Sequence, residues 1–386
     1  MPARFVYDPS RADFQDRIYE IYRTLRDEHP VYHNPERGFW ALSRFDDVRA
    51  AANDPRTFSS EGHSMSVGLL PHIQMMDPPR HDRLRNLVTV AFTPRRVSAM
   101  EPRVREIARE LIDGFAAVGD CDLLREFARH LPSRVIGEMI GVPPERREAF
   151  LLWTESMVET PSGEEHAANV REPATRIYEE FAELADERRR QRRGDLVSAL
   201  LDAQIDGERL SQQELLGFCF VLIVAGNDTT TNLIANGAAL LARHPEQRSM
   251  LVADPSRIPG AVEEMLRCES PAQALPRRAT REVELHGVTI PEGGEVKLVW
   301  GAANRDEREF EDPERFDVTR DVKRHLAFGQ GVHFCLGSNL ARLEARVAFE
   351  ELLARIPEYE LAAEPRWVTS IWARAPAALP IRFAAA

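Results

Sequence analysis

A cysteine near the C-terminal end of the chain lies in an unusual setting. Cys335 belongs to the run Phe328 to Gly337, which directly precedes an amphipathic stretch with helical spacing. A thiol of reference pKa about 8.5 must lose its proton to bind iron, and the free N–H groups of a helix N-terminus favour that anion. Gly331 and Gly337 permit backbone conformations that bring amides near the sulfur. A lone cysteine before a helix is usually a buried structural thiol, so the spacing alone leaves both a structural thiol and a metal-binding thiolate open.

A second unusual stretch interrupts a long apolar helix predicted from Gln212 to Arg243, which begins with a capping box of Ser211 and Glu214. The middle of this helix, residues 225–232, combines Gly with Asn, Asp and Thr. Gly costs about 1 kcal/mol relative to Ala, and each of the others up to about 0.7 kcal/mol. A local rule broken this heavily indicates a functional site. The alternative is a close helix crossing that needs small residues.

A third candidate group is a pair of opposite charges. Glu264 and Arg267 lie three residues apart on a predicted helix and share one face. Glu263, four residues before Arg267, is a competing partner. In isolation such a pair is a surface contact worth a few tenths of a kcal/mol.

These three features, in this order, resemble the cytochrome P-450 family of haem-thiolate monooxygenases. The resemblance covers nearly the whole chain and includes the ExxR motif of Glu264 and Arg267 and the later segment Pro313 to Phe316. Arg374 stands where the family has a glycine-containing turn. The resemblance implies a mainly α fold with small β-sheets, shaped as a triangular prism. One domain, residues 1–386, would hold haem b between the long central helix and the Cys-ligand helix.

The resemblance also assigns roles to individual residues. Cys335 would be the axial iron ligand, and Thr229 and Asp228 would be the alcohol and the acid of a proton relay to oxygen. The other expected cofactor contacts are His81, Arg85, Ala225, Gly226, Arg277, Phe328, Gly329 and His333. Arg85, Arg277 and the two histidines would bind the haem propionates. Glu264, Arg267 and Arg315 would form a buried triad that holds the Cys loop, the segment from Phe328 to Gly337.

By family position, a mostly apolar substrate pocket is expected. Its predicted lining residues are Leu69, Ile73, Val221, Val224, Gln273 and Trp372. Gln273 and His72 are candidates to hydrogen-bond a hydroxyl or carbonyl group. The implied reaction inserts one oxygen atom from O2 into a hydrophobic small molecule. Electrons would come from NAD(P)H through a separate ferredoxin and ferredoxin reductase. The alternatives are a peroxide-driven peroxygenase and a haem protein that binds a ligand without turnover, but neither needs the pair Asp228 and Thr229.

Composition narrows the partners and the compartment. The formal net charge of -12 argues against nucleic-acid binding. The basic run from Arg188 to Arg193 is interpreted as a solvated helix end. Residues 1–17 resemble no signal peptide, and the apolar stretch from Phe218 to Ala225 is far shorter than a membrane span, so we expect a cytoplasmic monomer. A local basic face for the ferredoxin could come from Arg80, Arg83, Arg342 and Arg346.

The elements that must position these residues are mostly helices, since apolar residues recur at three-to-four spacing through most of the chain. The predicted helices are Arg80–Phe92, Met100–Ala117, Leu124–Ile140, Glu145–Val158, Arg171–Arg193, Gln212–Arg243, Arg257–Cys268 and Ser338–Arg355. Short strands are predicted at Phe39–Leu42, Val283–Leu285, Val288–Ile290, Val296–Val299 and near the C-terminus.

Overall fold

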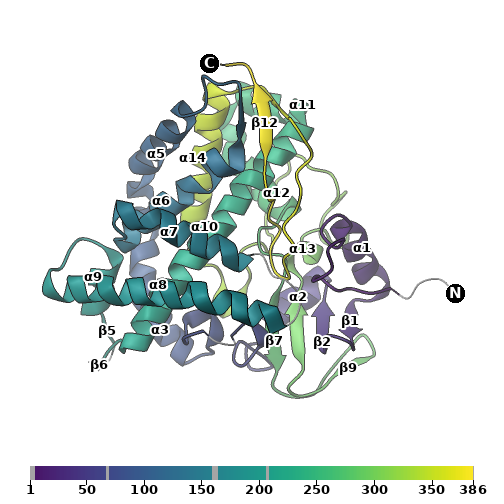
Figure 1. Cartoon of the computed structure of the whole chain (residues 1–386). Helices are drawn as coiled ribbons and strands as arrows, with labels where there is room; N and C mark the ends of the chain where they lie inside the picture. The colour runs from purple at the N-terminus through teal and green to yellow at the C-terminus, as the bar shows by residue number, and fades with distance from the viewer. Residues whose placement is uncertain (1–4, 67–68, 159–163, 206–207, 386) are drawn as a thin grey trace.

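The computed structural model describes residues 5–66, 69–158, 164–205 and 208–385. It is mainly helical with small sheets, which confirms the predicted fold class, and its outline in Figure 1 is triangular. The α-helices are α1 Ile18–Glu28, α2 Phe45–Ala52, α3 Arg80–Thr89, α4 Pro94–Ala99, α5 Glu101–Asp113, α6 His130–Ile140, α7 Pro144–Val158, α8 Glu164–Arg190, α9 Leu196–Asp202, α10 Gln212–Arg243, α11 Pro245–Ala253, α12 Ile258–Cys268, α13 Trp300–Ala303 and α14 Ser338–Arg355.

The strands form one larger sheet and three small ones. The larger sheet has the order β1-β2-β10-β7-β3, in which β10 runs parallel to β2 and the other neighbours are antiparallel. Its strands are β1 Val31–Asn34, β2 Phe39–Leu42, β3 Phe58–Ser59, β7 Leu275–Ala279 and β10 Glu295–Leu298. The small sheets are formed by β4 Asp120–Asp122 with β11 Tyr359–Leu361 and β12 Pro380–Phe383, by β5 Gln204–Ile205 with β6 Glu208–Arg209, and by β8 Val283–Leu285 with β9 Val288–Ile290.

Helix α10 is the central element of the helical part, and the strands β1, β2, β7 and β9 gather at the opposite corner in Figure 1. The predicted capping box of Ser211 and Glu214 is present at its start. Gly237 marks the point where three helices meet, because an added Cβ would lie 2.7 Å from Met265 on α12 and from Phe349 on α14. By length and composition α10 could cross a membrane, but 78% of its most apolar window is buried inside the protein. Its apolar surface is therefore used for packing.

The loop that carries Cys335 packs tightly before α14 begins. Gly331 has a φ of +72°, and an added Cβ would lie 2.4 Å from the carbonyl oxygen of Ala52 at the end of α2. Both the backbone conformation and the space therefore require glycine here. The amide of Cys335 donates to the carbonyl of Phe328 at 2.9 Å, which closes the loop.

Most predicted element boundaries agree with the structure, and the exceptions have local causes. The stretch predicted as one helix from Leu124 to Ile140 is divided into a π-helical turn, Leu124–Ala128, and α6. Helix α8 begins at Glu164, earlier than predicted, with Pro173 in its interior. A start at Arg171 would have placed Pro173 in the first turn, where proline is tolerated best.

The basic run at the end of α8 is not uniformly solvated, so that interpretation is wrong for one residue. Arg188 is only 1% exposed. Its guanidinium forms an ion pair with Asp195 and donates to the carbonyl of Gly141 at 2.9 Å. Arg188 therefore connects α8 to the end of α6 and the start of α9.

Candidate active site

A cavity of about 330 Å³ lies between α10, the Cys loop and the loop before α3. It brings together most of the predicted site residues, although they are distant in sequence. The predicted residues that line it are Leu69, Ile73, Arg85, Val221, Val224, Ala225, Gly226, Thr229, Arg277, Phe328, Gly329, His333, Cys335 and Trp372. The wall is mostly apolar, as expected for a site that binds a hydrophobic molecule.

Among the four cysteines, only Cys335 lines this cavity. Burial raises the pKa of its thiol, whereas the amide of Gly337 and the charges of Arg85 and Arg342 lower it. The Arg342 guanidinium also lies 4.4 Å from the centre of the Phe328 ring, beside the same loop. Cys335 is thus the one thiol with both access to the cavity and stabilising groups for a thiolate.

One side of the cavity collects basic groups. Arg277 is buried, and burial lowers the pKa of its guanidinium to about 10. The rings of His81 and His333 lie 4.4 Å apart, and the buried Nε2 atom of each has no partner in the described part of the chain. Burial, together with the nearby positive charge of Arg277, His81 and Arg85, lowers the pKa of His333 to about 2. Two unpartnered ring nitrogens beside the buried positive charge of Arg277 fit a group that carries carboxylates, such as the propionates of haem.

The four predicted propionate contacts are not equivalent. Arg85 already donates to the carbonyls of Val332, at 3.1 Å, and Phe334 in the Cys loop. His81 does not itself line the cavity; its Nδ1 atom lies 2.8 Å from Asp82, and its ring lies against that of His333. Arg277 and His333 are therefore the more direct candidates.

Helix α10 contributes Thr229 and Gly226 to the cavity. The Thr229 hydroxyl donates to the carbonyl of Ala225 at 2.6 Å. An added Cβ on Gly226 would lie 3.1 Å from Ile136 on α6. The small size of Gly226 therefore allows α10 to approach α6, in addition to leaving space in the cavity.

Asp228 lies behind Thr229 and does not line the cavity. Its Oδ1 atom accepts a hydrogen bond from the Asn227 amide at 3.0 Å, and the same amide donates to Thr154 on α7 at 2.7 Å. The buried Oδ2 atom has no partner in the described part of the chain. Burial and the neighbouring Glu155 raise the pKa of Asp228 well above its usual range, which favours the protonated form of its carboxyl group.

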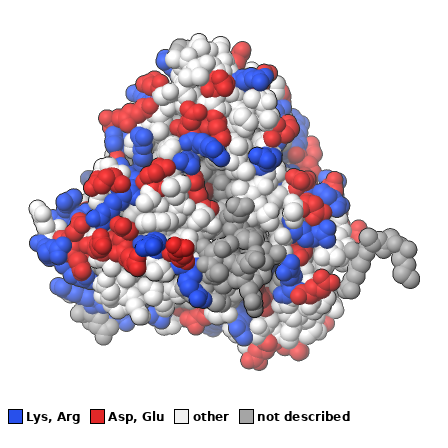
Figure 2. Space-filling view, viewed as in Figure 1, with Lys and Arg blue, Asp and Glu red and all other residues white. Residues whose placement is uncertain are grey.

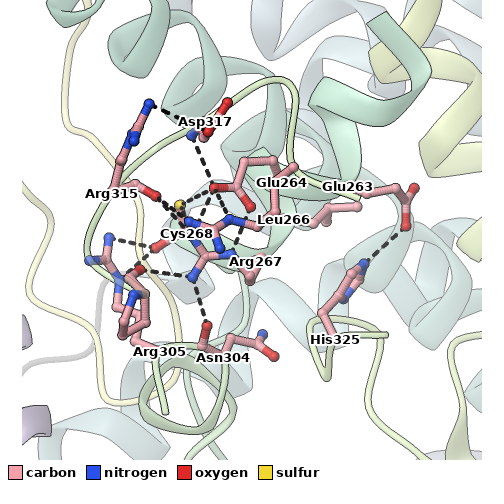
Figure 3. A network of polar contacts seen from close by, with 12 residues as sticks. Glu263, Glu264, Leu266, Arg267, Cys268, Asn304, Arg305, Arg315, Asp317 and His325 are labelled. Atoms are coloured by element: carbon pink, nitrogen blue, oxygen red, sulfur yellow. Dashed lines mark hydrogen bonds and ion pairs between the residues drawn. The ribbon is translucent and has the colours of Figure 1, made fainter. Parts of the chain in front are cut away.

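The side chains of Glu264 and Arg267 pair with each other, as Figure 3 shows, and both are fully buried. Arg267 donates from Nε and Nη2 to the two carboxylate oxygens of Glu264 at 2.7 and 2.8 Å. Its Nη1 atom donates to the carbonyls of Asn304, at 3.1 Å, and Pro313, at 2.8 Å. This pair connects α12 to two segments that precede the Cys loop.

The prediction that the Arg315 side chain completes a buried triad is wrong. Only its backbone carbonyl takes part, accepting a hydrogen bond from Arg267 at 3.1 Å. Its side chain points away from the pair in Figure 3, is 62% exposed and lies 3.6 Å from Asp317. Arg320 is the third member instead, with its Nε atom 3.1 Å from Glu264.

Glu263 contacts other residues and is not the partner of Arg267. It pairs with Arg342 on α14 at 2.7 and 2.9 Å and with His325, just before the Cys loop, at 3.0 Å. The contact with His325 is visible in Figure 3. This second group of charges also connects α12 to the Cys-bearing segment, and nothing in the local sequence pattern indicated it.

The predicted pocket residues line the cavity with one exception, Gln273. Its Nε2 atom donates to the carbonyl of Ser270 at 2.5 Å, and its Oε1 atom would lie only 2.0 Å from a Cβ added to Gly301. The Gln273 side chain therefore packs against α13, so its assignment to the pocket was wrong. His72, the other candidate hydrogen-bond partner for a substrate, does line the cavity. Residues that line it without having been expected there are His63, Met157, Phe220, Trp300 and Glu344.

The expected basic face for a ferredoxin is largely neutralised by its own surroundings. Arg342 pairs with Glu263, Arg346 with Glu101 at 2.6 Å, and Arg80 with Glu214 at 3.4 Å. On the face shown in Figure 2, positive and negative side chains are likewise interspersed. These three arginines therefore contribute less net positive charge than the sequence alone suggested.

Comparison with known proteins agrees with this geometry. The sequence profile of the cytochrome P450 family matches residues 149–357. Cytochrome P450 107B1 of Saccharopolyspora erythraea is 40% identical over 99% of this chain and 98% of that protein. The vitamin D(3) 25-hydroxylase of Pseudonocardia autotrophica is 42% identical over 92% of this chain and 90% of that protein.

Solved structures are similar over nearly the whole chain. CYP109E1 of Bacillus megaterium in complex with testosterone matches with a TM-score of 0.92 and 32% identity, covering 96% of this chain and 99% of that one. P450BioI in complex with a hexadec-9Z-enoic acid ligated acyl carrier protein matches with a TM-score of 0.90 and 35% identity, covering 97% and 100%. The chain therefore belongs to the cytochrome P450 family of haem-thiolate monooxygenases, which bind haem b, and it has the fold of that family.

Proposed function

We propose that this protein inserts one oxygen atom from O2 into a hydrophobic small molecule, with electrons from NAD(P)H that arrive through a separate ferredoxin and ferredoxin reductase. The observation that carries the proposal is the shared cavity. The thiol of Cys335 and the hydroxyl of Thr229 line one mostly apolar space, although they come from different elements. An oxidation site for an apolar compound requires a side chain that binds the cofactor, a polar group close to where oxygen reacts, and an apolar wall that excludes water.

In this proposal Cys335 would bind the iron of haem b as a thiolate. Phe328 and Gly329 shape the loop around the sulfur, and Arg277 and His333 bind the propionates, supported by Arg85 and His81. When bound, haem supplies the activation of O2. The protein supplies the thiolate, the positive charge that balances the propionates and the shape of the cavity. Glu264, Arg267 and Arg320 hold the segment that carries Cys335.

Asp228 and Thr229 form the proton relay in this proposal. The Thr229 hydroxyl has one proton, which it donates to Ala225, so its lone pairs remain free to accept a hydrogen bond in the cavity. Burial raises the pKa of Asp228 and favours its protonated form, and its Oδ2 atom has no partner in the described part of the chain, so it can hold and release the proton that oxygen chemistry consumes. A peroxygenase or a ligand-binding haem protein would have no use for this pair.

We also propose that the enzyme works as a cytoplasmic monomer made of one domain. The apolar surface of α10 supports this part of the proposal, since it packs against other helices and is not available to lipid. For the ferredoxin, the paired arginines favour docking that depends on shape and a few exposed cations more than on a broad positive field.

The test uses the purified holoprotein. The dithionite-reduced carbonyl complex should show the red-shifted Soret band of the family. Compounds that shift the Soret band are then incubated with NADPH, a surrogate ferredoxin and reductase, and isotopically labelled O2, and the product should carry one labelled oxygen atom. Product formed only with added hydrogen peroxide would indicate the peroxygenase. Compounds that bind but yield no product under either condition would indicate a ligand-binding protein.

A further inference from the structure

His72, which the sequence offered as a hydrogen-bond partner for a substrate, lines the cavity and takes no part in the function proposed above. His72 lies in the loop before α3, directly ahead of the short 3-10 helix Ile73–Met75. It is 4% exposed and lines the cavity together with apolar residues of α10. A buried polar group without a protein partner usually has a water or ligand partner, so this residue requires an explanation.

The position of His72 is determined by close packing against α10. A Cβ added to Gly217 would lie 2.3 Å from the carbonyl oxygen of Pro71 and 3.5 Å from the Cβ of His72. The absence of a side chain at Gly217 therefore lets this loop lie directly on the helix. The His72 ring also lies 6.1 Å from the ring of Phe220, one turn further along α10. The imidazole is held beside the N-terminal half of α10.

The imidazole of His72 is neutral at physiological pH. Burial and the nearby His63 lower its pKa to about 4. Its Nδ1 atom has no hydrogen-bond partner in the described part of the chain. A neutral imidazole has one N–H donor and one nitrogen acceptor, so it can bind a hydroxyl or a carbonyl oxygen. Without a positive charge it cannot compensate a buried carboxylate, which is costly to remove from water.

Helix α10 also gives an estimate of the distance between His72 and Thr229. Phe220, beside His72, precedes Thr229 by nine residues on α10, and a helical rise of 1.5 Å per residue separates them by roughly 13 Å. A ligand that contacts His72 and reaches the cavity beside Thr229 must span a distance of this order.

We propose that His72 anchors a neutral oxygen of the substrate, a hydroxyl or a carbonyl, on an otherwise apolar molecule that is oxidised roughly 10–13 Å away, beside Thr229. This inference rests on the proposed function and adds the substrate class. Among the relatives, one structure contains testosterone and another a fatty acyl group on a carrier protein. The neutral imidazole suits the uncharged oxygens of either kind of compound and disfavours the carboxylate of a free fatty acid.

The test measures ligand affinity from Soret shifts of the holoprotein. The probes are two matched pairs, testosterone with 5α-androstane and dodecan-1-ol with dodecane, and one acid, palmitoleic acid. In the natural protein the oxygenated neutral member of at least one pair should bind more tightly than its hydrocarbon. His72→Phe keeps an aromatic ring but no hydrogen bond, so it should weaken that binding by roughly three- to tenfold, as expected for one neutral hydrogen bond. The affinity for the hydrocarbon should stay within about twofold.

Two controls separate hydrogen bonding from packing. His72→Gln retains a donor and an acceptor and should restore most of the affinity for the oxygenated probe. Phe220→Leu changes the neighbouring wall without removing a polar atom, so it should weaken both members of a pair alike. Because His72 is already neutral, the affinity for the neutral probe should not change between about pH 5.5 and 8.

Three results would overturn the inference. In the first, no neutral oxygenated probe binds. In the second, the hydrocarbons or palmitoleic acid bind as tightly as the neutral oxygenated probes or more tightly. In the third, His72→Phe weakens the affinity for both members of a pair equally. These readouts need only the bound haem. A protein that binds the probes as expected but forms no product would refute the proposed function and leave this inference intact. If the protein forms product but substitution of His72 changes no ligand affinity, this inference is refuted and the proposed function stands.

Discussion

Replacement of Arg320 by Met tests which arginine completes the buried charge group around Glu264. Both carboxylate oxygens of Glu264 are bonded in a fully buried site, and Arg320 contributes one contact at 3.1 Å. In the variant Glu264 retains Arg267 and the amide of Asp317, also at 3.1 Å. The carboxylate therefore loses one charge-assisted hydrogen bond but is not left alone.

The expected magnitude is set mainly by that bond, because the other hydrogen bonds of Arg320, to the carbonyls of Glu311, Asp312 and Arg315, are exposed to solvent. A hydrogen bond to a charged group contributes about 1.5–3 kcal/mol. With an unfolding entropy of about 2.1 cal/mol/K per residue, a chain of 386 residues loses roughly 1 °C of Tm for each 0.8 kcal/mol. Arg320→Met should therefore lower Tm by roughly 2–4 °C. Arg267→Met should lower it by at least 4–6 °C, because removing one partner of a buried pair costs about 3–5 kcal/mol.

Arg315→Met is the matched control, since Arg315 is the arginine that the sequence pattern favoured. Its exposed contact with Asp317 at 3.6 Å should be worth less than about 1 kcal/mol. The assay is thermal unfolding of the holoproteins, followed by far-ultraviolet circular dichroism and by loss of the Soret band. A Tm for Arg320→Met that equals that of the natural protein, or a larger loss for Arg315→Met, would refute the assignment.

Three further substitutions test the proposed chemistry. Cys335→Ala should abolish the red-shifted carbonyl band, whereas Cys268→Ala should keep it, and a normal band in the Cys335 variant would exclude this residue as the ligand. Thr229→Ala removes a hydroxyl but not the cavity, so more peroxide and less product should form per NADPH consumed; unchanged ratios would contradict its role. Asp228→Asn removes the buried acid and should slow turnover on the order of 10²-fold without weakening ligand binding, and a rate equal to that of the natural protein would argue against the relay.

The features that the sequence determined by itself are local. The Cys loop, the interrupted helix and the pair Glu264 and Arg267 each lie within one short segment, so residue type and spacing marked them as candidates, and the family resemblance assigned their roles. The same holds for the capping box at the start of α10, because it depends on residues three positions apart. The mainly helical class followed from apolar periodicity along the chain.

Tertiary structure decided where individual side chains point. Arg315 and Gln273 occupy the expected segments, but one side chain faces solvent and the other packs against α13. Arg320 joins Glu264 and His72 reaches the cavity only because segments distant in sequence pack against α12 and α10. Side-chain direction and burial depend on such non-local packing, which residue spacing within one segment does not encode.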